Sequence, residues 1–598
     1  MSARRLLCVP LDPVHDVGIK IIRDALSRRG HQADLLSPDL PMEAIVSRAL
    51  ASPYDFILVS RTLGYGVAEL LGRFVDMLDA AGVRTTARIV IGGKAVTPEL
   101  AAELGFDRGF DEHATIEEIA AYIEDRPPAA SAGVAQREKR DLTAGYSYAF
   151  RNPEAGGYLD AIVEKLLRWS AGKTSPAVER ARLRAELLHH GEGGKTAAGR
   201  YAAFCDPVIR DANLNSSYPL GVRAVSEAET QALDGMLSGR TAVHPARIRH
   251  SGLKPAVFKF LGSGCPIMDI VHGRIGERWG IDGYLIINPS WEARYEGLLE
   301  GALTHQNDGT ITSLENITLM RRHLDPATLL TVRAHRGLNT PETVVLAGEG
   351  GADMTKINLV YGSLGAGTDP ERLTVDGIEA IKLTARYGMP FDIPGNDELS
   401  GVPAWKTLAG LLINAALGVR LGARPILKPL FCYGPHIVIN GLMQQNFIDY
   451  NTAKIRALRA IADAPIWPGE PIAFMTQSED RVQSASATSY HAALARTLDV
   501  DAITIASTDE AYSRGPICIA SRIDSIRAVT EAYRFVGDAG LAPTARADQA
   551  TDEMIAGITS TLQAVSEAPS LPDAIQAGLL GNTEDGAYPG TFGKGTVR

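Results

Sequence analysis

The sequence predicts an α/β protein with two parallel-sheet domains, and three observations support this prediction. The chain has 598 residues, more than one hydrophobic core usually covers. Strand-like and helix-like segments alternate five times near the N-terminus, and about eight times in the second half of the chain. We therefore expect an open-sheet domain at 1–126, a linker and helical segment at 127–250, a barrel at 251–545 and a C-terminal extension packing on the barrel at 546–598.

Composition narrows the class of protein. Hydrophobic residues make up 45% of the chain and charged residues 22%, as in ordinary globular proteins, and the net charge is −10. This balance argues against nucleic acid as a partner, because phosphate binding needs clustered Lys and Arg. We find neither a run long enough to span a bilayer nor a secretory signal. Five scattered cysteines without CxxC spacing favour a cytoplasmic protein.

The first domain reads as five strand and helix pairs. Helices are expected to begin near Val17, Met42, Val67, Thr97 and Thr115, after the strands "RRLLCVP", "QADLLS", "FILVS", "ARIVIGG" and "DRGF". Such alternation is typical of a flavodoxin-like (Rossmann-like) sheet with helices on both faces. Ligands of these sheets bind beyond the carboxyl ends of the strands. We therefore look for function in the turns that follow the strands.

Three turns at that edge carry unusual residues. The first, "LDPVHDVG", presents His15; the second begins at Ser60 in "SRTLGYG"; the third contains Gly92 and Gly93. The first turn has no GxGxxG, and its prolines remove backbone donors that a pyrophosphate would use, so a nicotinamide cofactor is disfavoured. Paired glycines allow a bulky planar ligand to lie close to the backbone. The three turns predict one shared ligand site.

Together these residues resemble the cobalamin-binding domain of adenosylcobalamin-dependent mutases, whose motif is Asp-x-His-x-x-Gly, then Ser-x-Leu, then Gly-Gly. The resemblance runs from about Leu6 to Ile123 and is closest to the small subunit of glutamate mutase. It implies that His15 is the lower ligand to cobalt. It also implies that the nucleotide tail of the cofactor lies in a channel formed by Gly18, Ser60, Leu63, Gly92 and Gly93.

The sequence departs from that motif at one position. Pro13 stands where the family has Asp, with Asp12 one place earlier and Asp16 just after His15. A carboxylate beside a metal-bound imidazole orients the ring and raises its basicity. The usual partner of His15 is therefore missing, or Asp12 or Asp16 has replaced it.

The second half of the chain predicts a (β/α)8 TIM barrel, preceded by helices over "YLDAIVEKLLRWSAG" and "AVERARLRAELLHHGEGGKTAAGRYAAF". Its strands are "AVFKFLG" or "GYLIINP", then "TLLTVRAH", "KINLVYG", "PFDIPG", "ARPILKPLF", "PIAFMTQ" and "AITIAS". Active sites of such barrels lie at the carboxyl ends of the strands. The polar residues expected there are Asn288, Arg333, His335, Arg336, Tyr361, Asp392, Asn396, Tyr433, His436, Asp509 and Glu510.

From about Gly283 onward the chain resembles the large subunit of glutamate mutase. "RAHRGLNTPE" is similar to its Arg-His-Gly-Thr-Pro-Asp turn, which implies that Arg333 or Arg336 grips a substrate carboxylate. "LFCYG" and "ITIASTDEA" resemble two further turns, and the second implies that Glu510 holds the ribose of the adenosyl group. The family's catalytic Glu, its Lys and two of its three carboxylate-binding arginines have no counterpart, so glutamate is not the expected substrate.

The resemblance implies a fused radical mutase that uses adenosylcobalamin. In that family the cobalt–carbon bond splits, and the 5′-deoxyadenosyl radical takes a hydrogen from the substrate before the carbon skeleton rearranges. The expected substrate is a small carboxylate, an amino acid or a 2-oxo acid. Tyr361, Tyr433 and His436 are candidates for hydrogen-bonding the substrate or lending a proton. A homodimer is compatible with this class.

Other classes remain open from the sequence. A corrinoid methyltransferase shares the binding domain, and so does a cobalamin-binding protein without catalysis. A pyridoxal-dependent aminomutase also uses such a domain, but it needs a lysine that forms a Schiff base, for which Lys94 is a candidate.

Overall fold

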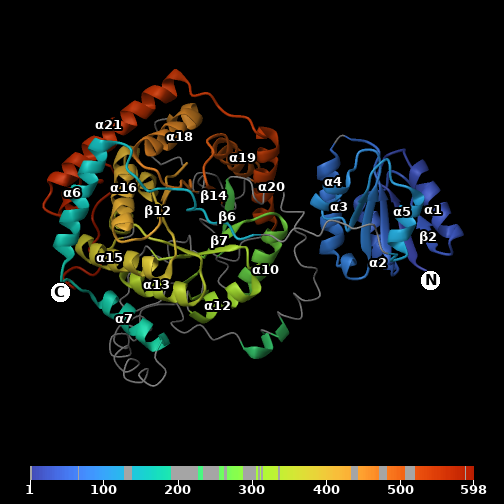
Figure 1. Cartoon of the computed structure of the whole chain (residues 1–598), viewed down its shortest axis with the longest axis horizontal. Helices are drawn as coiled ribbons and strands as arrows, with labels where there is room; N and C mark the ends of the chain where they lie inside the picture. Colours follow the sequence, from blue (N-terminus) through green and yellow to red (C-terminus); the bar gives the residue numbers. More distant parts are fainter. Residues whose placement is uncertain are drawn as a thin grey trace. The chain divides into compact units, whose positions relative to one another are not determined.

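The computed structural model describes residues 3–64, 66–126, 138–189, 226–229, 231–232, 255–261, 266–286, 305–306, 310–311, 314–334, 337–365, 367–431, 442–469, 481–505, 519–585 and 587–598. The chain divides into two compact units (Figure 1). The first unit comprises Met1–Arg137 with Val225–Arg249, and the second comprises Glu138–Ala224 with His250–Arg598.

The N-terminal unit contains a five-stranded parallel sheet with the strand order β2-β1-β3-β4-β5. Apolar residues of alternating strand positions form two separate cores, one on each face of the sheet, as expected for a flavodoxin-like fold. Each helix begins within one residue of its predicted start. The elements are β1 (Arg5–Pro10), α1 (Val17–Arg28), β2 (Gln32–Leu35), α2 (Met42–Ala51), β3 (Phe56–Ser60), α3 (Val67–Ala80), β4 (Arg88–Gly92), α4 (Pro98–Glu103), β5 (Arg108–Phe110) and α5 (Ile116–Ile123).

The second unit is built around seven parallel strands in the order β13-β12-β11-β10-β7-β6-β14. Residues 465–469 close this sheet between its two edges. Ile466 bridges to Leu427 of β13, and the amide of Asp501, just before β14, donates to the carbonyl of Ile466 at 2.9 Å. These seven strands and residues 465–469 are the eight strand positions, here called staves, of the predicted (β/α)8 barrel. The strands are β6 (Ala256–Leu261), β7 (Gly283–Ile286), β10 (Leu329–Arg333), β11 (Met354–Lys356), β12 (Phe391–Pro394), β13 (Pro425–Lys428) and β14 (Ala502–Ile505).

Helices surround the strands, as Figure 1 shows for the green to orange part of the chain. One helix follows each stave, which places the helices outside and the strand interior at the centre. They are α10 (Pro266–Arg278), α12 (Leu314–His323), α13 (Thr340–Glu349), α15 (Pro370–Tyr387), α16 (Ala404–Arg420), α18 (Leu442–Ile461), α19 (Arg481–Thr497) and α20 (Ile519–Val536). A short antiparallel pair, β8 (His305–Gln306) with β9 (Thr310–Ile311), lies between β7 and α12 in the chain.

Two details of the barrel differ from the sequence-based expectation. Both "AVFKFLG" and "GYLIINP" contain strands, whereas "KINLVYG" contains only the end of β11, because the chain turns at 357–360 into α14 (Tyr361–Leu364). The stave at 465–469 was not expected, since its two prolines each remove a ladder donor. The predicted strand "PIAFMTQ" lies outside the described residues.

Further elements pack on the outside of the barrel. The helix α7 (Pro176–His189) contacts α13, and α21 (Ala545–Glu567) contacts α18, α16 and α6 (Pro153–Ser170). The chain then passes through α22 (Leu571–Gln576) to the C-terminal residues, where Phe592 bridges to Thr368. The C-terminal segment is therefore tied to the loop between α14 and α15, on the side of the barrel where the strands end.

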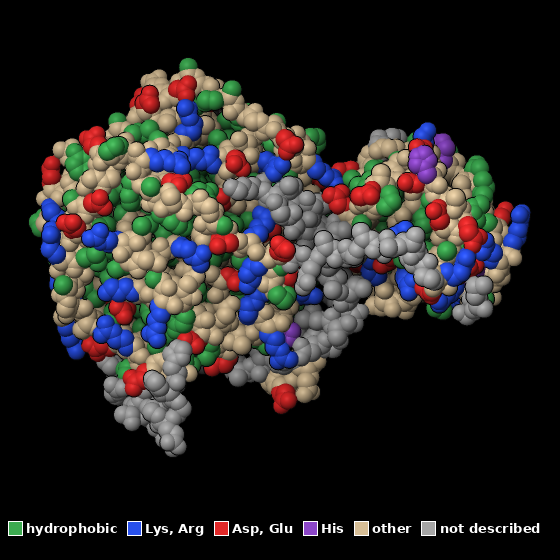
Figure 2. All heavy atoms as spheres, viewed as in Figure 1, with side chains coloured by type: hydrophobic (Ala, Val, Ile, Leu, Met, Phe, Trp, Pro, Cys, Tyr) green, Lys and Arg blue, Asp and Glu red, His purple; other side chains and the backbone are tan. Residues whose placement is uncertain are grey.

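The surface carries both signs of charge. Figure 2 shows acidic and basic side chains interspersed over both units on the face drawn. Within the described residues, no helix combines the length and apolar character needed to cross a bilayer.

Candidate functional site

The three unusual turns of the N-terminal unit lie side by side. β1, β3 and β4 are neighbours in the sheet, and the register pairs Pro10 with Ser60 and Ser60 with Gly92. The turns that follow these three residues therefore start at the same level of one edge. His15, Ser60 and the two glycines therefore lie on neighbouring turns at one edge of the sheet, and their binding of one shared ligand stays a prediction.

His15 is exposed at this edge and available to a ligand. Among the described residues its imidazole has neither a hydrogen-bond nor an ion-pair partner. Large apolar side chains flank it on the same turn and on the first turns of α1, namely Val14 (71% exposed), Val17 (68%) and Ile21 (53%). Apolar side chains that remain exposed around a free imidazole suit a broad planar ligand that covers them.

Asp12 does not act as the carboxylate partner of His15. Its side chain is buried, accepts a hydrogen bond from the amide of Thr62 at 2.7 Å and lies 3.4 Å from the guanidinium of Arg61. Arg61 in turn donates to the carbonyl of Leu11 at 2.8 Å. Asp12 and Arg61 therefore join the turn after β1 to the turn after β3.

Asp16 is also engaged elsewhere. It stands at the N-cap position of α1, and its carboxylate pairs with the ammonium of Lys20 at 2.6 Å. Neither Asp12 nor Asp16 is hydrogen-bonded to the imidazole. With Pro13 where the resembling family has Asp, His15 has no carboxylate partner among the residues that the structure describes.

The glycines of the site have different reasons for being there. Gly93 has φ +142°, and a Cβ atom at this position would lie 2.0 Å from the carbonyl oxygen of Arg61. It is required by the close approach of the turns after β3 and β4, a reason that the resemblance does not supply. Gly18, by contrast, has nothing within 4 Å of an added Cβ, so the surface beside α1 is open. Ser60 and Leu63 are half-buried.

The barrel interior has an apolar lower part and a polar upper part. The lower core draws Phe258, Leu285, Leu329, Met354, Ile426, Trp467 and Ala502 from seven of the eight staves. Side chains two or four residues further along a strand point to the same side. Arg333, Lys356 and Lys428 therefore point inward, nearer to the carboxyl ends. Asp392 also points inward, because it pairs in register with Lys356 and Ile426.

These four charged side chains are buried inside the barrel. Arg333 is 6% exposed, Lys356 and Lys428 are 1% exposed, and Asp392 is fully buried. The ammonium of Lys428 lies 3.3 Å from a carboxylate oxygen of Asp392 and 3.9 Å from the centre of the Trp467 ring. Lys356 and Lys428 thus add two cations to Arg333 in the interior, whereas the sequence comparison had considered only arginines as carboxylate-binding groups.

The other predicted barrel residues are only partly described. Tyr361 follows β11 as expected, is buried in α14 and packs its ring against Gly365. Asn358 positions that helix by accepting from the amide of Tyr361 and donating to the carbonyl of Pro394. Arg336, Tyr433, His436 and Glu510 lie outside the described residues, so their predicted roles stay predictions.

A carboxyl group with a raised pKa follows β12. Asp397 lies in a 3-10 turn (Asn396–Ser400), and burial, with the neighbouring Glu398 carboxylate, raises its pKa to about 8. Burial also raises the pKa of Glu398, although the ammonium of Lys454 at 2.7 Å opposes this effect. Asp397 is therefore a carboxyl group that can hold or release a proton near neutral pH at the carboxyl end of the barrel.

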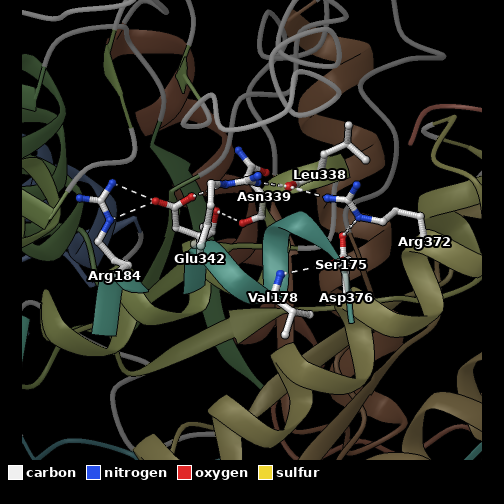
Figure 3. A network of polar contacts seen from close by, with 10 residues as sticks. Ser175, Val178, Arg184, Leu338, Asn339, Glu342, Arg372 and Asp376 are labelled. Carbon is white, nitrogen blue, oxygen red and sulfur yellow. Dashed lines mark hydrogen bonds and ion pairs between the residues drawn. The ribbon is translucent and has the colours of Figure 1, made fainter. Parts of the chain in front are cut away.

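A buried ionic network holds the loop after β10 (Figure 3). The guanidinium groups of Arg180 and Arg184, both on α7, pair with Glu342 of α13 at 3.2 Å and 2.9 Å. Arg372 of α15 pairs with Asp376 at 2.8 Å, and Arg180 and Arg372 both donate to the carbonyl of Leu338. The network therefore fixes the segment that leads away from Arg333.

Sequence reasoning missed Lys356, Lys428, Trp467 and Asp397. The available signal was a lysine two positions after an apolar residue within a short strand, as in "MTK" and "ILK". Such a lysine faces the same side as the core residue and is thus enclosed by the barrel. That inference needs the correct ends of each strand, and the predicted strand "KINLVYG" begins where β11 ends.

The N-terminal unit is similar in sequence to known proteins. Residues 6–121 match the family model described as the B12 binding domain. The β subunit of lysine 5,6-aminomutase from Fusobacterium nucleatum is 30% identical over 120 residues, which cover 18% of this chain and 46% of that protein. The corresponding subunit from Acetoanaerobium sticklandii is 26% identical over 119 residues, 18% of this chain and 45% of that protein. The chain thus spans about half the length of these curated relatives.

Similarity to solved structures is low over the whole chain. A cobalamin-binding protein from Desulfitobacterium hafniense aligns with 21% identity and a TM-score of 0.19, over 21% of this chain and 59% of that one. The relatives found are aminomutase subunits, so the specific resemblance to glutamate mutase remains a prediction. Residues 6–121 of this chain are therefore similar to a B12 binding domain.

Proposed function

We propose that the chain is a cobalamin-dependent isomerase in which the N-terminal unit holds adenosylcobalamin and the barrel holds a small substrate with a carboxylate. The observation that carries the proposal is the exposed, unpartnered imidazole of His15 at the edge of a B12-binding domain. When bound, adenosylcobalamin supplies a carbon-centred radical by homolysis of its cobalt–carbon bond.

The residues of the N-terminal unit support cofactor binding in distinct ways. His15 would bind the cobalt, and the exposed side chains of Val14, Val17 and Ile21 would offer the bound cofactor an apolar surface. The open surface at Gly18 and the half-buried Ser60 would hold the nucleotide tail. Asp12 and Arg61 hold the turns in place and do not touch the metal ligand.

The barrel residues act on the substrate. Arg333, buried at the carboxyl end of β10, binds a carboxylate, and the buried network behind it keeps its loop in position. Asp397, with its raised pKa, holds a proton at the same end of the barrel. The enclosed interior excludes water, which protects a radical from side reactions.

The test is retention of adenosylcobalamin by the purified full-length chain after removal of free cofactor, beside His15→Ala. We expect the wild type to retain the cofactor and the variant to lose it or to show a changed absorption spectrum. A wild-type protein that retains no cofactor, or a variant with an unchanged spectrum and affinity, contradicts the proposal.

The matched relatives favour a second candidate, an aminomutase that also uses pyridoxal phosphate. Lys94 is exposed in the turn after β4, at the same edge as His15, and can form an imine with an aldehyde. Reduction of the protein with borohydride in the presence of pyridoxal phosphate would then label Lys94, as read by peptide mass spectrometry. Equal labelling of Lys94 and other exposed lysines would remove this candidate.

A further inference from the structure

The barrel interior contains five buried polar side chains with atoms that have no hydrogen-bond partner among the described residues, although Lys428 and Asp392 form an ion pair. The five are Thr331, Asp392, Lys428, Trp467 and Thr504. They come from five different staves, and each is at most 1% exposed. Thr331 and Thr504 face inward because they lie two residues after the core residues Leu329 and Ala502.

This arrangement is costly for a structural core. A buried neutral donor or acceptor without a partner costs about 1–3 kcal/mol, and a charged one costs more. Within the described part of the chain, neither carboxylate oxygen of Asp392 accepts a hydrogen bond, and the ammonium of Lys428 at 3.3 Å forms its ion pair. An apolar filling of the same volume is often neutral or stabilising relative to such a pair. The polar set therefore indicates a binding site.

The chemistry of the five groups defines a complementary ligand. An ionised Asp392 can only accept hydrogen bonds, whereas Lys428 and the indole N–H of Trp467 can only donate them. The threonine hydroxyls can do either. A ligand that satisfies the set presents N–H donors with positive charge to Asp392 and oxygen acceptors with negative charge to Lys428.

We propose that this interior set is a subsite for an aminocarboxylate, with the ammonium group on Asp392 and the carboxylate directed to Lys428 and Trp467. The proposal rests on the proposed isomerase function and sharpens it, because a simple carboxylate or a 2-oxo acid would leave Asp392 without donors. A 2-oxo acid also places a carbonyl oxygen, rather than an ammonium group, beside that carboxylate.

The test is titration calorimetry of the cobalamin-loaded, full-length protein with the twenty proteinogenic L-amino acids and their 2-oxo acid counterparts. We expect at least one amino acid to bind, about 30-fold more tightly than its 2-oxo acid. Asp392→Asn should lower binding of that amino acid about 30-fold while changing binding of the 2-oxo acid little. Lys428→Met should weaken binding of both compounds.

Controls separate this subsite from folding and from the cofactor. Asp552→Asn removes a carboxylate on the exposed side of α21 and should change no affinity. Thr504→Val is a milder change inside the set and should weaken binding of the amino acid 3- to 10-fold. This variant carries the test if Asp392→Asn fails to fold. Equal binding of amino acid and 2-oxo acid, or no binding of any of these compounds by protein that retains cobalamin, overturns the subsite alone. Loss of cobalamin retention by the wild type overturns the proposed function instead.

Discussion

The two units place their functional groups in opposite environments. The N-terminal unit exposes the imidazole of His15, flanked by apolar side chains, on turns that are joined by the buried pair Asp12 and Arg61. The barrel hides its charged groups inside, where Asp392 and Lys428 are withdrawn from water. An exposed site suits a large cofactor that brings its own surface, whereas an enclosed one suits a small polar substrate. Under the proposed function, this difference assigns cofactor binding to the N-terminal unit and substrate binding to the barrel.

The largest effect is expected in the barrel, from breaking the buried network. Arg180→Met removes one of the guanidinium groups that pair with the buried carboxylate of Glu342, and should lower the free energy of unfolding by about 3–5 kcal/mol. All five tryptophans belong to the barrel unit, so urea denaturation followed by fluorescence reports on that unit. Arg182→Met, on the exposed side of the same helix, is the control and should cost below about 0.5 kcal/mol.

In the N-terminal unit, the two glycines should respond in opposite ways. Gly93→Ala forces a methyl group into the backbone of Arg61 and should destabilise this unit by about 3 kcal/mol. Gly18→Ala has open space and should leave stability unchanged or higher while weakening cobalamin binding. Hydrogen exchange of peptides from β3 and β4, together with cobalamin titration, measures both effects. Equal exchange in the two variants would mean that the turns are not interlocked.

Asp12→Asn tests the joint between the turns. The amide keeps one acceptor but loses the ion pair with Arg61, so the unit should lose about 1–2 kcal/mol. The amides of Thr62 and Leu63 should exchange faster, while the spectrum of bound cobalamin should keep its histidine-ligated form. A spectrum that changes as it does in His15→Ala would show instead that Asp12 serves the imidazole.

The smallest effect concerns pH and the barrel mouth. Because burial raises the pKa of Asp397 to about 8, the folded state binds a proton that the unfolded state has released, and stability falls as pH rises. The loss attributable to this group should be about 1.4 kcal/mol between pH 7 and pH 9. Asp397→Asn should abolish it in urea titrations at the two pH values. An unchanged pH dependence in this variant would mean that Asp397 does not titrate between pH 7 and pH 9.

The contrast between the units also explains what the sequence could predict. In the N-terminal unit the candidate residues His15, Ser60 and the glycines stand in short turns next to strong strand patterns, so their place at one edge of the sheet could be predicted from neighbouring residues. The inward position of Lys356 depends on where β11 ends. The strand position that contains Trp467 could not be recognised from sequence, because Pro465 and Pro468 argue against a strand there. Its strand pairing depends on partners more than 30 residues away in the chain, such as Leu427 and Asp501. Local patterns do not contain that information.

The most direct test of the account is electron paramagnetic resonance of cobalt(II) cobalamin bound to the full-length chain, with histidine labelled by ¹⁵N. If His15 is the lower ligand, the splitting of each cobalt line should change from a triplet to a doublet on labelling. His15→Ala should remove this splitting by histidine nitrogen. A triplet that persists in the labelled protein would show that the cofactor's own base remains on the metal, and the central claim about His15 would be wrong.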